Sequence, residues 1–364
     1  MNSAPLPRYN WSQSYDWNYR HAPDALARAE PSVPGVWDFC GLPAGSPLGI
    51  AAGPLLNGRW ILYYAALGFD VLTYKTVRSR AHASYAVPNL QPVATTEIHD
   101  DQGILPASPA MHGSWAVSFG MPSKTPEIWR ADVEATRRAL PQEKILSVSV
   151  VATPEPDWNL EQVADDFALC ARWAVESGAD CIEANFSCPN VASADGQLYQ
   201  QPESAAVVAA RLRAAIGPRP LLIKIGHVSD ESVAIKLAEA LAPRVNALVM
   251  VNCISARIVD QHHQPLFDGQ KRGIAGDAIR KAALSQIELF ARVIRDCQLN
   301  LRLVGVGGIA SASHVRSHLE AGSHAVQLAT AAMLQPEIGF AIRENLAGIQ
   351  TMQTSLIAQP NRHG

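Results

Sequence analysis

A six-residue segment in the middle of the chain contains a thiol suited to proton-transfer chemistry. Residues 185–190 read Asn-Phe-Ser-Cys-Pro-Asn and directly follow a short apolar run. A free thiol has a pKa of about 8.5, so Cys188 can remove a proton wherever its surroundings favour the thiolate. A cysteine taken alone is more often a small buried apolar residue. From the residue alone, both interpretations fit Cys188.

Lys224 ends another apolar run, at 220–226. A lysine at the end of a buried strand is costly unless an anion offsets its charge. Either a bound anionic group or a structural ion pair with a neighbouring segment fits this position. Asn252 ends the run at 247–253, where it is either a ligand-binding amide or a buried structural one.

These side chains need a scaffold, and repetition along the chain indicates which one. Short apolar runs rich in β-branched residues alternate with Ala-rich segments of helical period, and near-continuous apolar runs are typical of parallel strands buried on both faces. The runs lie at 47–53, 70–77, 145–152, 180–186, 220–226, 247–253, 302–308 and 325–330. Eight such units predict a closed (β/α)8 barrel, a TIM barrel, of the α/β class. A doubly wound open sheet is the alternative, but no G-x-G-x-x-G opens a first helix.

Glycines mark the ends of several predicted helices. The segment 160–178 spaces its apolar residues at helical period and ends in Gly178. Glycine favours this position because it adopts positive φ without a Cβ clash. The same order of helix, glycine and strand recurs at Gly68, Gly217 and Gly322.

Two segments interrupt the repeat, and a third precedes it. Residues 78–126 follow the second strand, and we expect them to form a loop or a small hairpin subdomain over the barrel mouth. Residues 253–276 follow the sixth strand, and loops after strand ends build the active sites of such barrels. Residues 1–46 form an aromatic N-terminal arm before a single domain at 47–364. We expect this extension to pack on the barrel; an interfacial membrane contact and a dimer clasp are its alternatives.

Composition excludes several functional classes. Apolar residues make up 48% of the chain and charged residues 17%, which favours a large globular core. The net charge of −3 gives no reason to expect nucleic acid as a partner. The cysteines form no C-x-x-C pair, so a metal or iron–sulfur site is not expected and the cytoplasm is the default compartment. No apolar stretch approaches the ~20 residues that span a bilayer.

The segment 185–190 resembles the N-x-S-C-P-N signature of class 1 dihydroorotate dehydrogenases, and the resemblance extends over about 47–346. It implies an FMN-dependent oxidoreductase that oxidises dihydroorotate, with Cys188 as the base that removes the C5 proton. It implies that Asn185 and Asn190 hold the pyrimidine, and it makes FMN the expected cofactor. Class 1 enzymes are commonly homodimers, which we also expect here.

The same resemblance assigns the remaining site residues. The substrate-binding set is Lys75, Phe119, Gly120, Met121, Asn185, Asn190, Asn252 and Cys253. The cofactor-binding set is Ala52, Gly53, Lys75, Thr76, Asn185, Lys224, Gly276, Gly307, Gly308, Ala329 and Thr330. Its last four members follow strands seven and eight, the recurrent phosphate site of such barrels. Lys224 corresponds to a lysine near flavin N1 and O2, where a cation stabilises the reduced anionic ring.

The chain also departs from the family. Val117 occupies the position of an asparagine that binds the pyrimidine, and Cys253 replaces a Ser or Thr. Loss of a buried amide partner costs about 1–3 kcal/mol. Either Val117 is misaligned within a variable loop, or the substrate differs from dihydroorotate.

Alternative functions follow from these departures. They are a flavin enzyme acting on another dihydropyrimidine or an activated alkene, and a flavin-binding barrel without turnover. Dihydropyrimidine dehydrogenase carries iron–sulfur cysteines that this chain lacks, and dihydrouridine synthases need a basic RNA-binding surface. No nicotinamide-binding motif identifies the electron acceptor, so fumarate, a quinone, oxygen and a separate electron-transfer subunit all remain alternatives.

Overall fold

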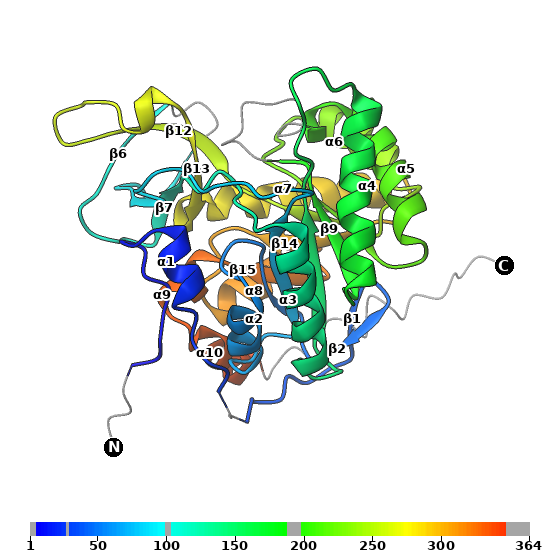
Figure 1. The fold of residues 1–364 in the computed structure, drawn as a ribbon, viewed down its shortest axis with the longest axis horizontal. Helices are drawn as coiled ribbons and strands as arrows, with labels where there is room; N and C mark the ends of the chain where they lie inside the picture. Colours follow the sequence, from blue (N-terminus) through cyan, green and yellow to red (C-terminus); the bar gives the residue numbers. More distant parts are fainter. Residues whose placement is uncertain (1–4, 27–28, 99–102, 188–197, 347–364) are drawn as a thin grey trace.

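Eight parallel strands form a closed barrel in the computed structural model, which describes residues 5–26, 29–98, 103–187 and 198–346. Each strand pairs with the next in the chain, and the last pairs with the first (Figure 1). The strands are β3 (Leu48–Ile50), β4 (Val71–Val77), β8 (Ile145–Val150), β9 (Cys181–Asn185), β10 (Leu221–Lys224), β11 (Ala247–Met250), β14 (Arg302–Val306) and β15 (Ala325–Leu328). All eight lie within the predicted runs, which confirms the barrel and excludes the open sheet.

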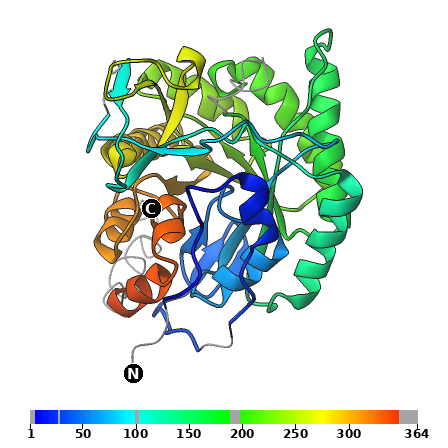
Figure 2. The ribbon, with the colours of Figure 1, turned by 60° about the vertical axis from the view of Figure 1, so that its left-hand side comes forward.

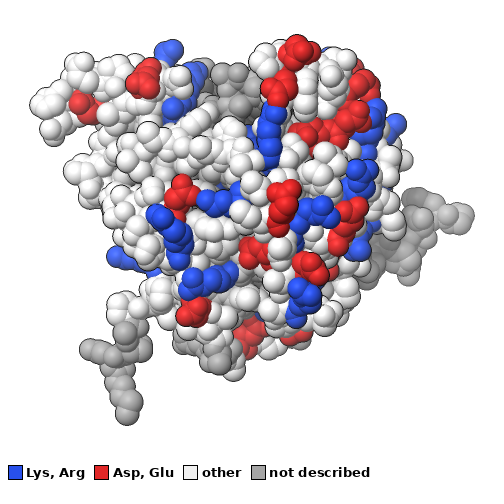
Figure 3. Space-filling model, viewed as in Figure 1, with Lys and Arg blue, Asp and Glu red and all other residues white. Residues whose placement is uncertain are grey.

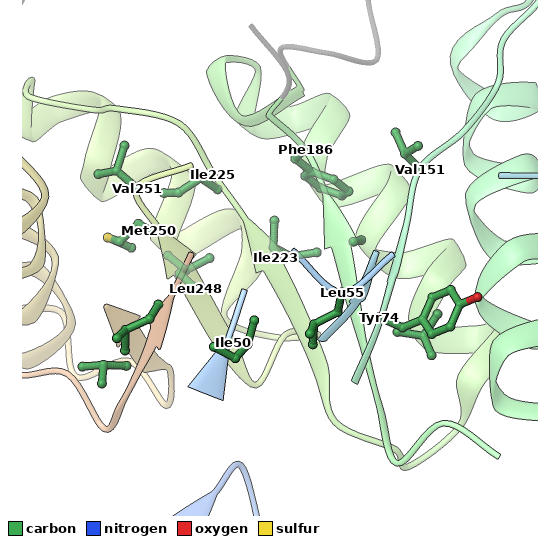
Figure 4. Close-up of a cluster of buried hydrophobic side chains, with 14 of the residues drawn as sticks. Ile50, Leu55, Tyr74, Val151, Phe186, Ile223, Ile225, Leu248, Met250 and Val251 are labelled. Carbon is green, nitrogen blue, oxygen red and sulfur yellow. The ribbon is translucent and has the colours of Figure 1, made fainter. Parts of the chain in front are cut away.

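Helices alternate with these strands and cover the outside of the barrel. They are α2 (Gly58–Ala65), α3 (Pro126–Ala139), α4 (Leu160–Glu176), α5 (Pro202–Ile216), α6 (Glu231–Leu241), α7 (Arg280–Asp296), α8 (Ala312–Glu320), α9 (Thr330–Leu334) and α10 (Ile338–Asn345). Figure 4 shows the apolar layer between strands and helices, with Ile223, Leu248 and Met250 among its members.

Helix α4 illustrates why these segments begin and end where they do. The Asn159 side chain accepts a hydrogen bond from the Gln162 amide, and the Gln162 side chain accepts one from the Asn159 amide. This capping box satisfies two backbone donors that a helix start leaves unpaired. The helix ends just before Gly178, which has φ +99°. The other three predicted glycines also have positive φ, as expected: Gly68, Gly217 and Gly322.

The two predicted insertions combine into one sheet over the mouth of the barrel. Its strands are β5 (Leu90–Pro92), β6 (Ile104–Pro106) and β7 (Ser114–Val117) from the first insertion, and β12 (Ile254–Val259) and β13 (Arg272–Gly276) from the second. Their order is β5-β7-β13-β12-β6, with β7 antiparallel to β13 at the centre. The short helices η2 (Phe267–Gly269) and η3 (Asp277–Ile279) flank β13. The prediction of loops or a hairpin therefore underestimated this subdomain.

Two regular elements of the segment before the barrel pack on it. Helix α1 (Tyr15–Arg20) lies beside the insertion sheet, where the dark-blue arm runs along the cyan strands (Figure 2). The hairpin of β1 (Trp37–Phe39) and β2 (Leu42–Ala44) lies at the opposite end, where Phe39 packs with Val71 and Cys181 inside the barrel. The arm thus contains regular elements, whereas an extended segment was expected. Its residues Tyr9 and Tyr15 are buried in the core of the same chain.

Part of the barrel interior is polar. Thr73, Ser149, Glu183 and Gln327 are all buried, although bulky apolar side chains usually fill such barrels. The Gln327 side chain donates to Thr73 Oγ1 at 3.1 Å from the far side of β3. Gln327 reaches Thr73 across β3 at Gly49, where a side chain would crowd it, because a Cβ there would lie 3.2 Å from the Gln327 side chain. A polar layer therefore lies within the barrel.

Candidate active site

Two adjoining hollows lie at the carboxyl ends of the barrel strands, under the insertion sheet. Their volumes are about 280 Å³ and about 120 Å³. They share the wall residues Asn252, Ala275, Val306, Ala329 and Thr330. Ligand sites of α/β barrels form at this end, from the loops that follow the strands.

The smaller hollow gathers most of the predicted site. Its walls come from the ends of β3, β4, β9, β10 and β11 and from the loop after β7. The predicted residues that line it are Ala52, Gly53, Lys75, Thr76, Phe119, Gly120, Met121, Asn185, Lys224, Asn252, Cys253, Ala329 and Thr330. Val117 lines it as well, so an apolar residue forms this part of the cavity wall.

The larger hollow ends in a wall of glycines. Gly276, Gly307 and Gly308 line it, and all three have positive φ. A Cβ at Gly307 would lie 2.8 Å from Ala283 Cβ, and one at Gly308 would lie 2.4 Å from Arg280 Cβ. Side chains cannot be accommodated there, so main chain forms the wall. Such a wall offers backbone N–H groups to an anion.

Two amides fix the end of β9. Asn185 Oδ1 accepts a hydrogen bond from the Ser187 amide at 3.0 Å, and its Nδ2 lies 3.4 Å from Met121 Sδ. The Asn252 side chain donates to the Ser187 carbonyl, which links β11 to the same segment. Cys188 and Asn190 lie outside the described residues, so Ser187 is the last described residue before the predicted base.

Both predicted lysines are buried in the wall of the smaller hollow. Lys75 is 6% exposed, and its ammonium lies 4.7 Å from the Phe119 ring centroid and 5.4 Å from that of Tyr15. Lys224 is 3% exposed at the end of β10. Desolvation costs both ammonium groups energy, which cation–π contacts offset in part for Lys75.

Glu183 is a buried acid near Lys224 that sequence reasoning missed. It lies on β9 and is fully buried. Burial raises its pKa, while Lys224, Ser149 and Gln327 partly oppose the shift. Neither carboxylate oxygen makes a hydrogen bond of ordinary geometry with a described residue. Glu183 therefore influences Lys224 through space, and the ion-pair alternative for Lys224 gains no direct contact from this acid. Its sequence signal was a charged residue within an apolar strand.

Comparisons with known proteins agree with this architecture. A closed α/β barrel with a cavity at the carboxyl ends of its strands is the architecture of α/β-barrel enzymes. The family model "Dihydroorotate dehydrogenase" matches residues 112–349. The chain is 30% identical over 363 residues to dihydroorotate dehydrogenase of Dictyostelium discoideum, covering 93% of this chain and 97% of the relative. This chain therefore belongs to the dihydroorotate dehydrogenase family, as its sequence motifs predicted.

More distant proteins share part of the sequence or the fold alone. A "Dihydroorotate dehydrogenase B (NAD(+)), catalytic subunit" of Solidesulfovibrio magneticus is 31% identical over 185 residues, covering 50% of this chain and 58% of the relative. The ligand-free dihydroorotate dehydrogenase structure from Eimeria tenella aligns with a TM-score of 0.73 at 16% identity, over 95% of this chain and 98% of that one. The latter supports the fold.

Proposed function

We propose that this protein is an FMN-dependent oxidoreductase that oxidises dihydroorotate in pyrimidine biosynthesis. One observation carries the proposal: a hollow lined by two lysines and two asparagines adjoins a hollow that ends in a glycine wall. The first has the hydrogen-bonding groups that a charged pyrimidine needs, and the second has room for a phosphate. The family membership of the chain supports this combination.

The residues present fit FMN. Gly276, Gly307 and Gly308 form main-chain walls where a phosphate would bind, together with Ala329 and Thr330. A Cβ at Gly53 would meet no atom within 4 Å, so this part of the wall is open to a flat ring, beside Ala52. Thr76, Asn185 and Lys224 complete the set that would hold the cofactor. When bound, FMN supplies two-electron chemistry by accepting a hydride.

The substrate would bind in the smaller hollow. Dihydroorotate carries a carboxylate and amide edges, which the ammonium of Lys75 and the amides of Asn185, Asn190 and Asn252 can bind. Phe119, Gly120, Met121 and Cys253 would enclose it and exclude water. A dry site strengthens each of these polar contacts.

Cys188 is the proposed general base. It directly follows Ser187, whose amide and carbonyl are held by Asn185 and Asn252. The thiolate would take the C5 proton of the substrate onto its sulfur. A base positioned by rigid neighbours contributes roughly 10²–10⁴-fold to rate.

Two measurements on the purified protein test this function. Denaturation should release FMN, and anaerobic mixing with dihydroorotate should bleach the flavin absorbance. Dihydrouracil, which lacks the carboxylate, is the matched control and should reduce the flavin far more slowly. Release of FAD would contradict the cofactor assignment. A flavin that no dihydropyrimidine bleaches would favour a flavin-binding barrel without turnover.

A second candidate function is the oxidation of a different dihydropyrimidine or the reduction of an activated alkene. The observation that favours it is the apolar residue Val117, which lines the substrate hollow at the position where the resemblance implies an asparagine. Faster bleaching by a substrate without a polar group at that edge would select this candidate.

Assembly and location complete the proposal. We propose a homodimer, which light scattering at micromolar concentration checks, and a monomer there would contradict it. Among the described residues, no helix is long and apolar enough to cross a membrane. The cysteine usage of the sequence supports a cytoplasmic protein.

A further inference from the structure

Tyr15 packs against the cavity wall from behind. Its side chain is 3% exposed, and its ring lies 6.3 Å from the Phe119 ring in an edge-on arrangement. The Lys75 ammonium lies 5.4 Å from the Tyr15 ring centroid and 4.7 Å from that of Phe119. Phe119 and Lys75 line the smaller hollow, whereas Tyr15 does not. A residue of the N-terminal arm thus contacts two wall residues without facing the cavity.

Asn89 ties the same arm residue to the loop that carries Phe119. Its Oδ1 accepts a hydrogen bond from the Tyr15 amide at 2.8 Å, and its Nδ2 donates to the Ser118 carbonyl at 3.1 Å. Nδ2 also donates to the Tyr85 carbonyl at 3.0 Å. The Ser118 amide in turn donates to the Asn89 carbonyl at 2.8 Å. A buried amide with several partners fixes the backbone it joins, because each lost bond would leave a buried polar group unpaired.

The second insertion holds the same loop from the other side. Arg272, on β13, donates from Nε to Ser118 Oγ at 2.8 Å. The backbone before Phe119 is therefore held between the arm and the insertion sheet.

We propose that Tyr15 and Asn89 are positioning residues, through which the N-terminal arm fixes Phe119 and the Lys75 ammonium in the substrate wall and raises affinity for an anionic pyrimidine. This role rests on the proposed function. The aromatic face of Tyr15 and Phe119 restricts where the buried cation lies, because a cation is attracted to the centre of a ring face. The Asn89 hydrogen bonds fix the backbone at Tyr15 and at Ser118, next to Phe119, and so hold the two rings at a fixed separation.

The matched variants are Tyr15→Leu and Tyr15→Phe. Leucine keeps apolar volume but removes the ring, whereas phenylalanine keeps the ring and removes only the hydroxyl. Asn89→Asp keeps the acceptor for the Tyr15 amide and, when ionised, cannot donate to Ser118. Trp17→Ala is the control on the same helix, because its ring stacks on His21 at 4.0 Å and does not line the hollow.

The test uses the FMN-loaded enzyme and measures the Kd of orotate from its perturbation of flavin absorbance, together with KM, kcat and Tm. Tyr15→Leu should raise Kd and KM about tenfold with kcat changed less, and Asn89→Asp should act in the same direction. Tyr15→Phe and Trp17→Ala should bind orotate within about twofold of wild type.

Two contrary outcomes have different meanings. If Tyr15→Leu and Asn89→Asp lower Tm but leave Kd and KM unchanged, both residues only stabilise the fold and the positioning role is wrong. If the wild-type holoenzyme binds no orotate and is not reduced by dihydroorotate, the proposed function itself fails, and this role fails with it.

Discussion

At the scale of single residues, a buried acid and a buried lysine share the layer beneath the cavity. Glu183 and Lys224 lie on adjacent strands, where Leu222 is the register partner of Glu183 and Asn185 that of Lys224. Interactions between charges are strong where water is excluded. Lys224 faces the cavity wall, so its charge is available to a bound anion.

Lys224→Ala should weaken FMN retention or lower the flavin reduction potential, because the cation stabilises negative charge on the reduced ring. Dialysis followed by flavin quantification measures retention, and equilibration with reference dyes measures potential. Lys281→Ala is the control, since that lysine is 69% exposed, pairs with Glu97 and lines neither hollow. Full FMN occupancy with an unchanged potential would assign Lys224 a structural role.

If dihydroorotate is the substrate, Val117→Asn should lower its KM by about tenfold, because the variant adds a hydrogen-bonding partner worth about 1–3 kcal/mol to the wall of the hollow. Steady-state kinetics of this variant and of Val117→Ala distinguish the effect of adding an amide from the effect of removing the valine side chain. A KM that rises for dihydroorotate in both variants would indicate that Val117 fits a different substrate.

The sequence allowed prediction of the strand-end residues but not of the contacts beneath and behind them. The positions of Lys75, Asn185, Lys224 and Asn252 were predictable because each lies at or near the end of an apolar run at the same edge of the barrel. Asn89 was not, because its partners are distant in sequence and no local pattern joins it to Tyr15.

At the scale of elements, long apolar runs were predictable and short strands were not. The barrel strands lie inside longer apolar runs, so even the three-residue β3 could be located, whereas β5 and β6, also of three residues, lie in no such run. Strands this short carry little periodicity, and pairing β7 with β13 joins segments more than 150 residues apart. The insertion sheet therefore follows from tertiary contacts.

A buried ion cluster joins several elements near the start of the barrel strands. Asp70 Oδ1 pairs with Lys144 Nζ at 2.7 Å and Asp70 Oδ2 with Arg343 Nη2 at 3.0 Å. Lys144 also pairs with Glu30 of the arm at 2.7 Å. One charge network thus joins residues just before β4 and β8, a residue of α10 and a residue of the arm.

Asp70→Asn should destabilise the protein by about 3–5 kcal/mol, because it leaves two buried cations underpaired. Urea unfolding measures the free energy of unfolding. Asp24→Asn is the control, since its pair with Arg59 is largely exposed and should contribute less than about 1 kcal/mol. If Asp70→Asn lowered the free energy of unfolding as little as Asp24→Asn does, the cluster would not stabilise the fold.

At the scale of the whole molecule, acidic and basic side chains are interspersed over much of the face in Figure 3.

A buried histidine is a second electrostatic feature of the whole molecule. His318 on α8 is 1% exposed, and burial lowers its pKa to about 4, with smaller contributions from His314 and Arg280. Gly305 makes room for it, because a Cβ there would lie 2.4 Å from His318 Nδ1.

This histidine should make global stability depend on pH. The unfolded chain binds a proton at a pKa of about 6.5, whereas the folded chain excludes it until about 4. The unfolded state thus binds more protons in this window, so stability is lost as pH falls from about 6.5 to about 4. Between pH 7 and 5 the loss should be about 1–2 kcal/mol. Urea unfolding should show a smaller pH dependence in His318→Leu, and an identical one would remove this explanation.

The central claim is that Cys188 is the catalytic base. Its position depends on one residue, one strand end and the whole barrel, because it follows a strand end fixed by two amides at the mouth of the barrel. Anaerobic stopped-flow mixing of dihydroorotate with Cys188→Ala tests it most directly. The variant should bind FMN and orotate nearly normally but reduce its flavin roughly 10²–10⁴-fold more slowly than wild type. Cys188→Ser should keep some activity and need higher pH, because an alkoxide forms less readily than a thiolate. A Cys188→Ala reduction rate within a few-fold of wild type, with an unchanged pH profile, would contradict the assignment of Cys188 as the base.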